Sequence, residues 1–281
     1  MLVNLNDLLP DAAASDYSVP CFNVFGYEDA RAVVEAAEEV GKAVILACNK
    51  DVVDFYGVET AAAMFLNLAH NSSVPVCLHL DHTYEEDIVY RALKAGFSSV
   101  MFDGSQLTLE ENIARTKKVV DVAHALGASV EGEIGSVPYE EGRDHIKSIY
   151  TEPEDAARFA EESGVDCVAI SVGNIHRLTE PTCTIDFGRL DRIASEVSVP
   201  LVIHGSSGIR DEDMLKLKQS RVSKFNIGTC LRQALGHNLR GYMNDEPQKF
   251  DRIYFMQKQC RTLSKKRFAT LSYYLKIESP T

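Results

Sequence analysis

Eight short apolar runs recur along the chain, and most are followed by a segment with helical periodicity. The runs occupy residues 18–25, 42–49, 74–82, 98–104, 129–135, 167–173, 200–205 and 223–229. Most are rich in Val, Ile, Leu and Phe with little polar alternation, which is typical of parallel strands buried on both faces. The segments between them, such as EDARAVVEAAEEVG and EPEDAARFAEESG, have apolar residues at helical spacing. Glycines at 41, 96, 127 and 164 follow these segments, where a helix C-terminus favours positive φ.

This rhythm predicts an α/β protein with a (β/α)8 TIM barrel and one additional C-terminal helix. An open doubly wound sheet needs only about six strands, and the first run lacks the G-x-G-x-x-G fingerprint of its nucleotide-binding form. We find no linker rich in Pro, Ser and Gly. We therefore expect one domain over residues 1–281, with a helical extension over about 250–281.

The charge balance excludes several classes of partner. The chain carries 29 basic and 41 acidic residues, a net charge of −12, which argues against nucleic acid or an anionic membrane as a partner. No apolar run approaches the roughly 20 residues of a membrane span, and the N-terminus lacks the pattern of a signal peptide. The seven cysteines are scattered without a C-x-x-C pair, which favours reduced thiols and a cytoplasmic location.

Polar side chains gather at the carboxyl ends of the predicted strands. In a (β/α)8 barrel these ends form the active-site face. A chain selected only for stability would not place polar groups there repeatedly. The residues concerned are Asn23, Asn49, Lys50, His79, Asp81, His82, Asp103, Glu131, Glu133, His176, His204 and Asn226.

Three of these histidines indicate a metal site. A lone His at a strand end is more often a structural residue, but His82, His176 and His204 come from three different βα units. Three imidazoles with one open position are what a catalytic zinc ion requires. Asp81 is adjacent to His82 and is expected to face the other way. It could orient an imidazole or act as a general acid/base, and its position alone does not decide between the two.

Two glycine-containing turns follow the last two strands. The sequences HGSSG and NIGT each lead into a predicted helix, so they place small residues and free backbone N–H groups at helix N-termini. In a barrel this is the usual phosphate site. The candidate residues are Gly205, Ser206, Ser207, Asn226, Gly228 and Thr229.

Taken together, these motifs resemble the class II, zinc-dependent ketose-bisphosphate aldolases, which act on fructose and tagatose bisphosphates. The similarity extends over about residues 1–245 and rests on LHLDH, GFSSVMFDGS, SVEGEIG, VGNIH, HGSSGI and FNIGT. It implies that Asp81 is the catalytic acid/base and that one Zn2+ per subunit binds the three histidines. It also implies that Asp103 and Glu133 lie near the metal, that Glu140 and Glu141 belong to a mobile catalytic loop, and that Na+ or K+ binds near the phosphate turns.

The resemblance further implies the reaction. A phosphorylated ketose is cleaved reversibly to dihydroxyacetone phosphate and an aldehyde through a zinc-stabilised enediolate, in a homodimer or homotetramer. A Schiff-base aldolase would need a desolvated lysine within the barrel. The run CVAISVG has none, and Lys224 lies near the start of the last run. The rival interpretations are a metal-dependent hydrolase and a non-catalytic barrel that binds sugar phosphates.

The chain departs from the family pattern where the aldehyde half of the substrate would bind. Arg177 stands where relatives have glycine, and Asn49 and Lys50 follow a strand after which relatives often have a phosphate-binding serine. The predicted mobile loop, VPYEEGRD, has fewer glycines, and the C-terminal tail is divergent, with Arg261 as a candidate for the distal phosphate. We therefore expect an aldolase whose substrate carries a phosphate, sulfonate or carboxylate at its distal end. Lys50 or Arg177 would supply the counter-charge for that group.

Overall fold

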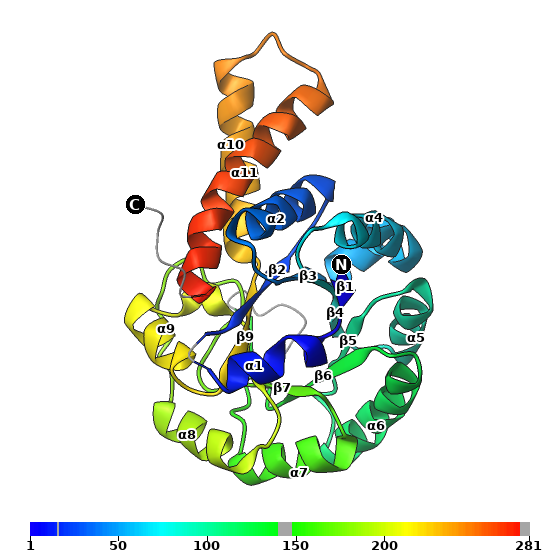
Figure 1. Ribbon diagram of the computed structural model, residues 1–281. Coiled ribbons are helices and arrows are strands. Elements are labelled where there is room, and N and C mark those ends of the chain that lie inside the picture. Colours follow the sequence, from blue (N-terminus) through cyan, green and yellow to red (C-terminus); the bar gives the residue numbers. More distant parts are fainter. Residues whose placement is uncertain (16, 140–147, 276–281) are drawn as a thin grey trace.

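The computed structural model describes residues 1–15, 17–139 and 148–275, with side chains described as far as residue 264 in the last helix. Eight parallel strands close into a barrel in the order β2-β3-β4-β5-β6-β7-β8-β9, and β9 pairs with β2 (Figure 1). The predicted (β/α)8 barrel is thus confirmed. The barrel strands are β2 Val19–Asn23, β3 Val44–Cys48, β4 Val76–Thr83, β5 Ser99–Phe102, β6 Ser129–Ile134, β7 Cys167–Ile170, β8 Leu201–Ile203 and β9 Val222–Ile227.

Helices surround the barrel and alternate with the strands. Gly41, Gly96, Gly127 and Gly164 all have positive φ at or just beyond helix ends, as their positions predict. The N-terminus of α6 is fixed by a reciprocal capping box between Thr108 and Glu111. The helices are α1 Leu9–Ala13, α2 Tyr27–Val40, α3 Lys50–Tyr56, α4 Val58–Asn71, α5 Glu86–Ala95, α6 Leu109–Ala125, α7 Pro153–Ser163, α8 Phe187–Glu196, α9 Asp211–Lys218, α10 Thr229–Asp245 and α11 Arg252–Leu275.

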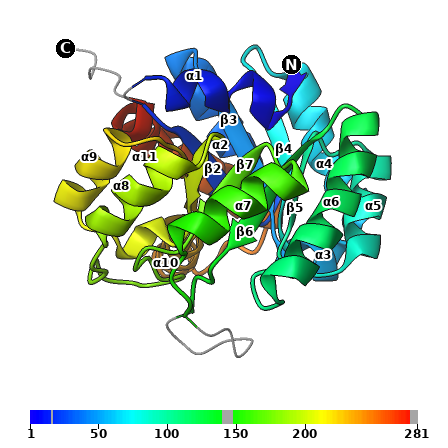
Figure 2. The same cartoon turned by 90° about the horizontal axis from the view of Figure 1, so that it is seen from below.

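The N-terminal segment closes the amino end of the barrel. Its short strand β1 (Leu2–Val3) pairs with β4, and the 3-10 turn η1 (Leu5–Asp7) and α1 lie across the barrel end (Figure 2). Leu5, Leu9 and Ala12 pack against inward side chains of the strands. The carboxyl end is left as the face on which a site can form.

Alternation along the strands separates two apolar layers. On β4, Leu78 and Leu80 face the helices, whereas Cys77 and His79 face the interior of the barrel. Gly132 on β6 allows a helix to approach closely, because a Cβ there would lie 2.6 Å from Cζ of Phe159 on α7. The outer layer therefore fixes how the strands are placed relative to the helices.

The C-terminal helix α11 extends beyond the barrel unit. It runs back along α10 and packs on α2, so that α10 and α11 project together from one side of the barrel (Figure 1). The predicted additional C-terminal helix is confirmed. No single helix among the described residues is long and apolar enough to cross a membrane, and α3 with α4 meets that test only as a pair bent by 107°.

Candidate active site

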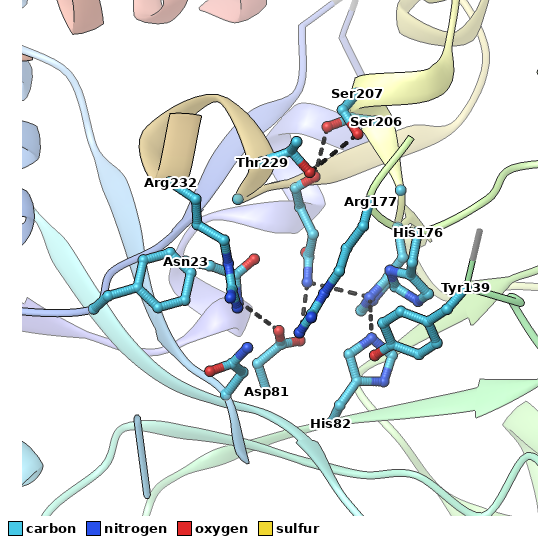
Figure 3. A pocket seen from close by; sticks show the side chains of 16 residues that line it. Asn23, Asp81, His82, Tyr139, His176, Arg177, Ser206, Ser207, Thr229 and Arg232 are labelled. Carbon is cyan, nitrogen blue, oxygen red and sulfur yellow. Dashed lines mark hydrogen bonds between the residues drawn. The ribbon is translucent and has the colours of Figure 1, made fainter. Parts of the chain in front are cut away.

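A polar pocket opens at the carboxyl ends of the barrel strands (Figure 3). Most of the candidate residues named from the sequence line it, so the barrel brings together side chains from β2, β4, β9 and the loops after β7 and β8. The lining consists of Asn23, Phe25, Asn49, Asp81, His82, Tyr139, His176, Arg177, His204, Gly205, Ser206, Ser207, Asn226, Gly228, Thr229 and Arg232. Phe25, Tyr139 and Arg232 were not predicted.

Three imidazoles converge at the floor of this pocket. One nitrogen each of His82, His176 and His204 lies within 4.8 Å of the others, and all three residues are buried. Nε2 of His82 and Nδ1 of His204 are 2.8 Å apart. The ring of His176 stacks on Tyr139 with centroids 4.5 Å apart, which fixes its plane.

Carboxylates behind the rings decide which nitrogen is free. Nδ1 of His82 lies 2.9 Å from Oδ2 of Asp103, and Nε2 of His204 lies 2.8 Å from Oε1 of Glu131. Since an ionised carboxylate only accepts hydrogen bonds, each ring carries its proton on that outer nitrogen. In the metal-free protein a protonated His82 donates its Nε2–H to Nδ1 of His204. Once His82 loses that proton, the lone pairs of His82 Nε2 and His204 Nδ1 face each other, an arrangement that fits a shared cation between them.

Two further observations fit a metal at this position. Within the described residues, the buried Nε2 of His176 has no hydrogen-bond partner. Burial and the nearby charge of His82 hold the pKa of both His176 and His204 well below the usual value, so these rings are neutral and can donate a lone pair. The donor set suits a divalent cation of the zinc type.

A second group of possible ligands lies beside the first. His82, Asp103 and Glu133 also have ligand atoms within 4.8 Å of one another. Within the described residues, Oε2 of Glu133 has no hydrogen-bond partner. Burial and the charge of Asp103 raise the pKa of Glu133 well above its usual value. Asp103 and Glu133 lie behind His82 and do not line the pocket.

Asp81 is held by two amide groups. Nδ2 of Asn23 donates to its Oδ2 at 2.6 Å, and Nδ2 of Asn226 donates to its Oδ1 at 2.9 Å. Burial alone raises the pKa of Asp81, but the neighbouring charge of His82, helped by the hydrogen bond from Asn23, outweighs burial, and the pKa lies below its usual value. The carboxylate is therefore ionised and fixed in orientation at the pocket wall.

A local irregularity in β4 places Asp81 and His82 at the same pocket. Strict alternation would turn two adjacent side chains to opposite faces, and the expectation that Asp81 faces away from His82 is wrong in this respect. His82 has φ of 41°, and the register with β5 shifts between Leu80 and Thr83. Positive φ is uncommon outside glycine, and such backbone strain often occurs at active sites.

The predicted phosphate turns lie side by side. Gly205 has φ of 67° and approaches the backbone of Ile175 so closely that a Cβ would lie 2.4 Å from its carbonyl oxygen. The hydroxyl of Ser207 lies 3.3 Å from that of Thr229, which joins the turn after β8 to the N-terminus of α10. Both turns present small residues to the pocket.

The comparisons with known proteins agree with this geometry. Residues 3–275 match the family described as fructose-bisphosphate aldolase class-II. The chain belongs to this family. The solved structure of the YdjI aldolase from Escherichia coli K12 is 31% identical, with a TM-score of 0.84 over 98% of this chain and 97% of that one. Fructose-bisphosphate aldolase from Campylobacter jejuni has the same fold, at 24% identity and a TM-score of 0.82, covering 97% and 95% of the two chains.

As a class II aldolase, the chain is a lyase of a generally metal-dependent family that acts on sugar phosphates.

The pocket mouth of this aldolase carries two arginines that share one carboxylate. Oδ2 of Asp51, at the start of α3, lies 3.1 Å from Arg177 and 2.8 Å from Arg232. The guanidinium of Arg232 also lies 4.0 Å from the ring centre of Phe25. Arg232 follows the phosphate turn by one helical turn, a spacing from which it could have been predicted.

Some predicted residues of this aldolase lie elsewhere. Lys50 pairs with Asp54 on the exposed face of α3 and does not line the pocket. Arg261 is exposed on α11 and is not among the lining residues. The loop candidates Glu140 and Glu141 fall outside the described residues.

Lys224 lies inside the barrel of this aldolase. Its place near the start of the last run had indicated that it lies at the wrong end of the strand for Schiff-base chemistry. Its Nζ is fully buried, 2.8 Å from Oε2 of Glu131 and 2.6 Å from Oδ1 of Asn226. Burial alone would lower the pKa of Lys224, but surrounding anionic groups, including Glu131 and Asp81, raise it above its ordinary value. A lysine held protonated in this way is a poor nucleophile for Schiff-base chemistry.

Proposed function

We propose that this aldolase uses Zn2+ to cleave a phosphorylated ketose reversibly into dihydroxyacetone phosphate and an aldehyde, with Asp81 as general acid/base. The observation that carries the proposal is the opposition of His82 Nε2 and His204 Nδ1 beside a fixed, ionised Asp81. This arrangement supports a cation site and a proton acceptor on the walls of one pocket.

In this proposal His82, His176 and His204 hold one Zn2+ per subunit. When bound there, Zn2+ supplies a Lewis acid for the negative charge that develops on the ketone half, a contribution of several kcal/mol. Asp103 and Glu131 hold the rings in the tautomers that such binding requires. Glu133, with Asp103 and His82, provides an alternative and more buried position for the ion.

Asp81 carries the proton in the proposed step. During cleavage it accepts the proton of the C4 hydroxyl, the C3–C4 bond breaks, and its electron pair stays on the ketone half while C4 becomes the aldehyde carbon. In condensation, Asp81 returns the proton to the new hydroxyl oxygen. The amides of Asn23 and Asn226 hold the carboxylate in place and favour its ionised form. We also retain Glu140 and Glu141 as candidates for proton transfer on the ketone half.

The phosphate of the ketone half is proposed to bind at the turns after β8 and β9. Gly205, Ser206 and Ser207 contribute one turn, and Gly228 and Thr229 contribute the start of α10, a helix of 17 residues. Free backbone N–H groups and the helix dipole favour an anion at such a position. A Na+ or K+ ion would bind near the same phosphate.

The far end of the substrate is proposed to meet Arg177 and Arg232. Both guanidinium groups line the pocket, and their shared ion pair with Asp51 supports recognition of an anionic group by this pair. Asn49, on the same wall, is a further polar contact. The proposal covers fructose 1,6-bisphosphate, tagatose 1,6-bisphosphate and related ketose 1-phosphates whose distal group is anionic.

We further propose that the enzyme is a cytoplasmic homodimer or homotetramer. Phe250 and Ile253, at the end of the projecting α10–α11 pair, are 96% and 62% exposed, which supports burial against another subunit. None of the seven cysteines is in a disulfide, which suits a reducing compartment. Light scattering coupled to size-exclusion chromatography tests the assembly.

One assay series tests the proposed function. The purified protein is analysed for bound zinc and assayed for cleavage of a panel of ketose phosphates, with and without chelator. Exchange of solvent protons into dihydroxyacetone phosphate is followed in parallel. We expect zinc, exchange and cleavage of at least one ketose phosphate. Absence of both zinc and exchange would refute the proposal, and phosphate ester hydrolysis without carbon–carbon cleavage would favour the metal-dependent hydrolase.

A further inference from the structure

A buried ammonium group lies beneath the site and takes no part in the chemistry proposed above. Lys224 is fully buried on β9, with its side chain directed into the barrel on the same face as Asn226, two residues later. Desolvating an ammonium ion costs several kcal/mol unless it is paired and hydrogen-bonded. Its two partners, Glu131 and Asn226, are also the residues that contact His204 and Asp81.

The first partner connects Lys224 to the metal site. One carboxylate oxygen of Glu131 lies 2.8 Å from Nζ of Lys224, and the other accepts a hydrogen bond from Nε2 of His204 at 2.8 Å. With Lys224 on one side, the carboxylate is compensated in charge and fixed in orientation. His204 must then keep its proton on Nε2 and present the lone pair of Nδ1 to the pocket.

The second partner connects Lys224 to Asp81. An ammonium group only donates hydrogen bonds, so the atom of Asn226 that lies 2.6 Å from Nζ must be the amide oxygen. The amide nitrogen is thereby directed to Oδ1 of Asp81, at 2.9 Å. The reverse orientation of the amide would place an oxygen against an ionised carboxylate, which is repulsive.

We propose that Lys224 is a positioning residue that fixes both halves of the site, the metal-facing lone pair of His204 through Glu131 and the hydrogen bond to Asp81 through Asn226. The inference rests on the proposed function, which assigns a metal to His204 and proton transfer to Asp81. It adds a residue without substrate contact on which metal affinity and turnover both depend.

The test removes the charge and replaces the side chain with an unbranched apolar one that is only one atom shorter. Lys224→Met leaves Glu131 as an uncompensated buried carboxylate, so the double variant Lys224→Met with Glu131→Gln is made beside it to restore neutrality. Zinc affinity is measured by competition with a chelator, and Co2+ is bound in place of zinc so that its visible absorption reports the ligand geometry. The matched control is Lys218→Met, because Lys218 is a buried lysine on α9 that does not line the pocket.

We expect at least a tenfold loss of zinc affinity and an altered Co2+ spectrum in Lys224→Met, or in the double variant if the single one does not fold, consistent with the effect of lost ligand support. We also expect kcat to fall more than KM changes. Lys218→Met should keep the wild-type affinity and spectrum. Wild-type affinity, spectrum and kcat in a folded variant that lacks Lys224 would overturn the inference.

The contact through Asn226 is tested separately by a double-mutant cycle on kcat. Asn226→Ala should cost less in the Lys224→Met background than in the wild type, because the amide is already misoriented there. Full additivity would refute this half of the inference. Failure of the proposed function itself looks different, because the wild-type protein would then lack zinc and cleavage, whatever the behaviour of the Lys224 variants.

Discussion

Nε2 of His82 and Nδ1 of His204 lie 2.8 Å apart, and the other nitrogen of each ring is hydrogen-bonded to a carboxylate. We expect removal of metal by a chelator to abolish cleavage and lower the melting temperature. An ion present at about 100 times its Kd stabilises the fold by ~2.7 kcal/mol. Zinc analysis and thermal unfolding check this. His204→Gln should lose the metal, whereas His124→Gln, which alters a surface contact with Asp166, should keep it. An unchanged melting temperature on chelation would contradict the assignment.

Zinc binding should release a proton near neutral pH. Burial lowers the pKa of His82, but Asp81, Asp103 and other nearby groups outweigh it and raise the pKa well above its usual value in the metal-free protein. We therefore expect about one proton released per zinc at pH 7.5, measured calorimetrically in buffers of different ionisation enthalpy. Zinc affinity should fall as the pH falls. A binding enthalpy independent of the buffer would show that His82 is already neutral.

The same shift sets the sign of a stability change in the metal-free protein. Because the folded-state pKa of His82 is raised, His82 contributes to the free energy of unfolding. This contribution is fully present below about pH 6.5, the ordinary pKa of histidine. That contribution is lost as the pH rises through the raised value. Denaturant titrations of the chelated protein at several pH values measure it, and a rise in stability with pH across this range would count against it.

Asp81→Ala should abolish turnover and leave the metal in place. General acid/base groups contribute about 10²–10⁴-fold to rate, and Asp81 bonds to two amides and makes no hydrogen bond to the three imidazoles. The measurements are kcat and zinc content. Asp54→Ala, which removes an exposed partner of Lys50, is the control and should retain activity. Loss of zinc in Asp81→Ala would make Asp81 a structural partner of the metal site.

The arginines at the pocket mouth should act on the distal group of the substrate. A hydrogen bond to a charged group is worth about 1.5–3 kcal/mol, so Arg177→Ala and Arg232→Ala should each raise KM for a bisphosphate at least tenfold. They should have little effect on a ketose 1-phosphate with an uncharged distal end. Arg210→Ala, on α9, is the control. A similar rise in Arg261→Ala alone would instead place the distal contact on α11.

Gly132 should be required for the packing of α7 on β6. A Cβ at this position would lie 2.6 Å from Phe159, so Gly132→Ala should destabilise the protein by about 1–3 kcal/mol. In Gly241→Ala on α10 the added Cβ meets no atom within 4 Å, and this variant should be stabilised by about 0.5–1 kcal/mol. Denaturation midpoints measure both changes. Equal stability of the two variants would argue against close packing at Gly132.

The sequence by itself determined the barrel and which polar residues meet at its carboxyl face. Buried parallel strands require continuous apolar runs, and the carboxyl ends of those runs meet on one face, so His82, His176 and His204 could be grouped without coordinates. The glycines at helix ends and the two phosphate turns were predicted for similarly local reasons. Local patterns are sufficient where backbone conformation alone decides the outcome.

Only the tertiary structure decided which partner each polar group has. Two sets of contacts join residues that are far apart in the chain. One is the enclosure of Lys224 by Glu131 and Asn226, and the other is the bridge from Asp51 to Arg177 and Arg232. The bend at His82 is a third feature that the sequence did not reveal. Such pairings depend on strand register, on a local shift of that register and on the direction of side chains across the barrel. A one-residue shift reverses the face that a strand residue presents, so spacing in the sequence could not specify them.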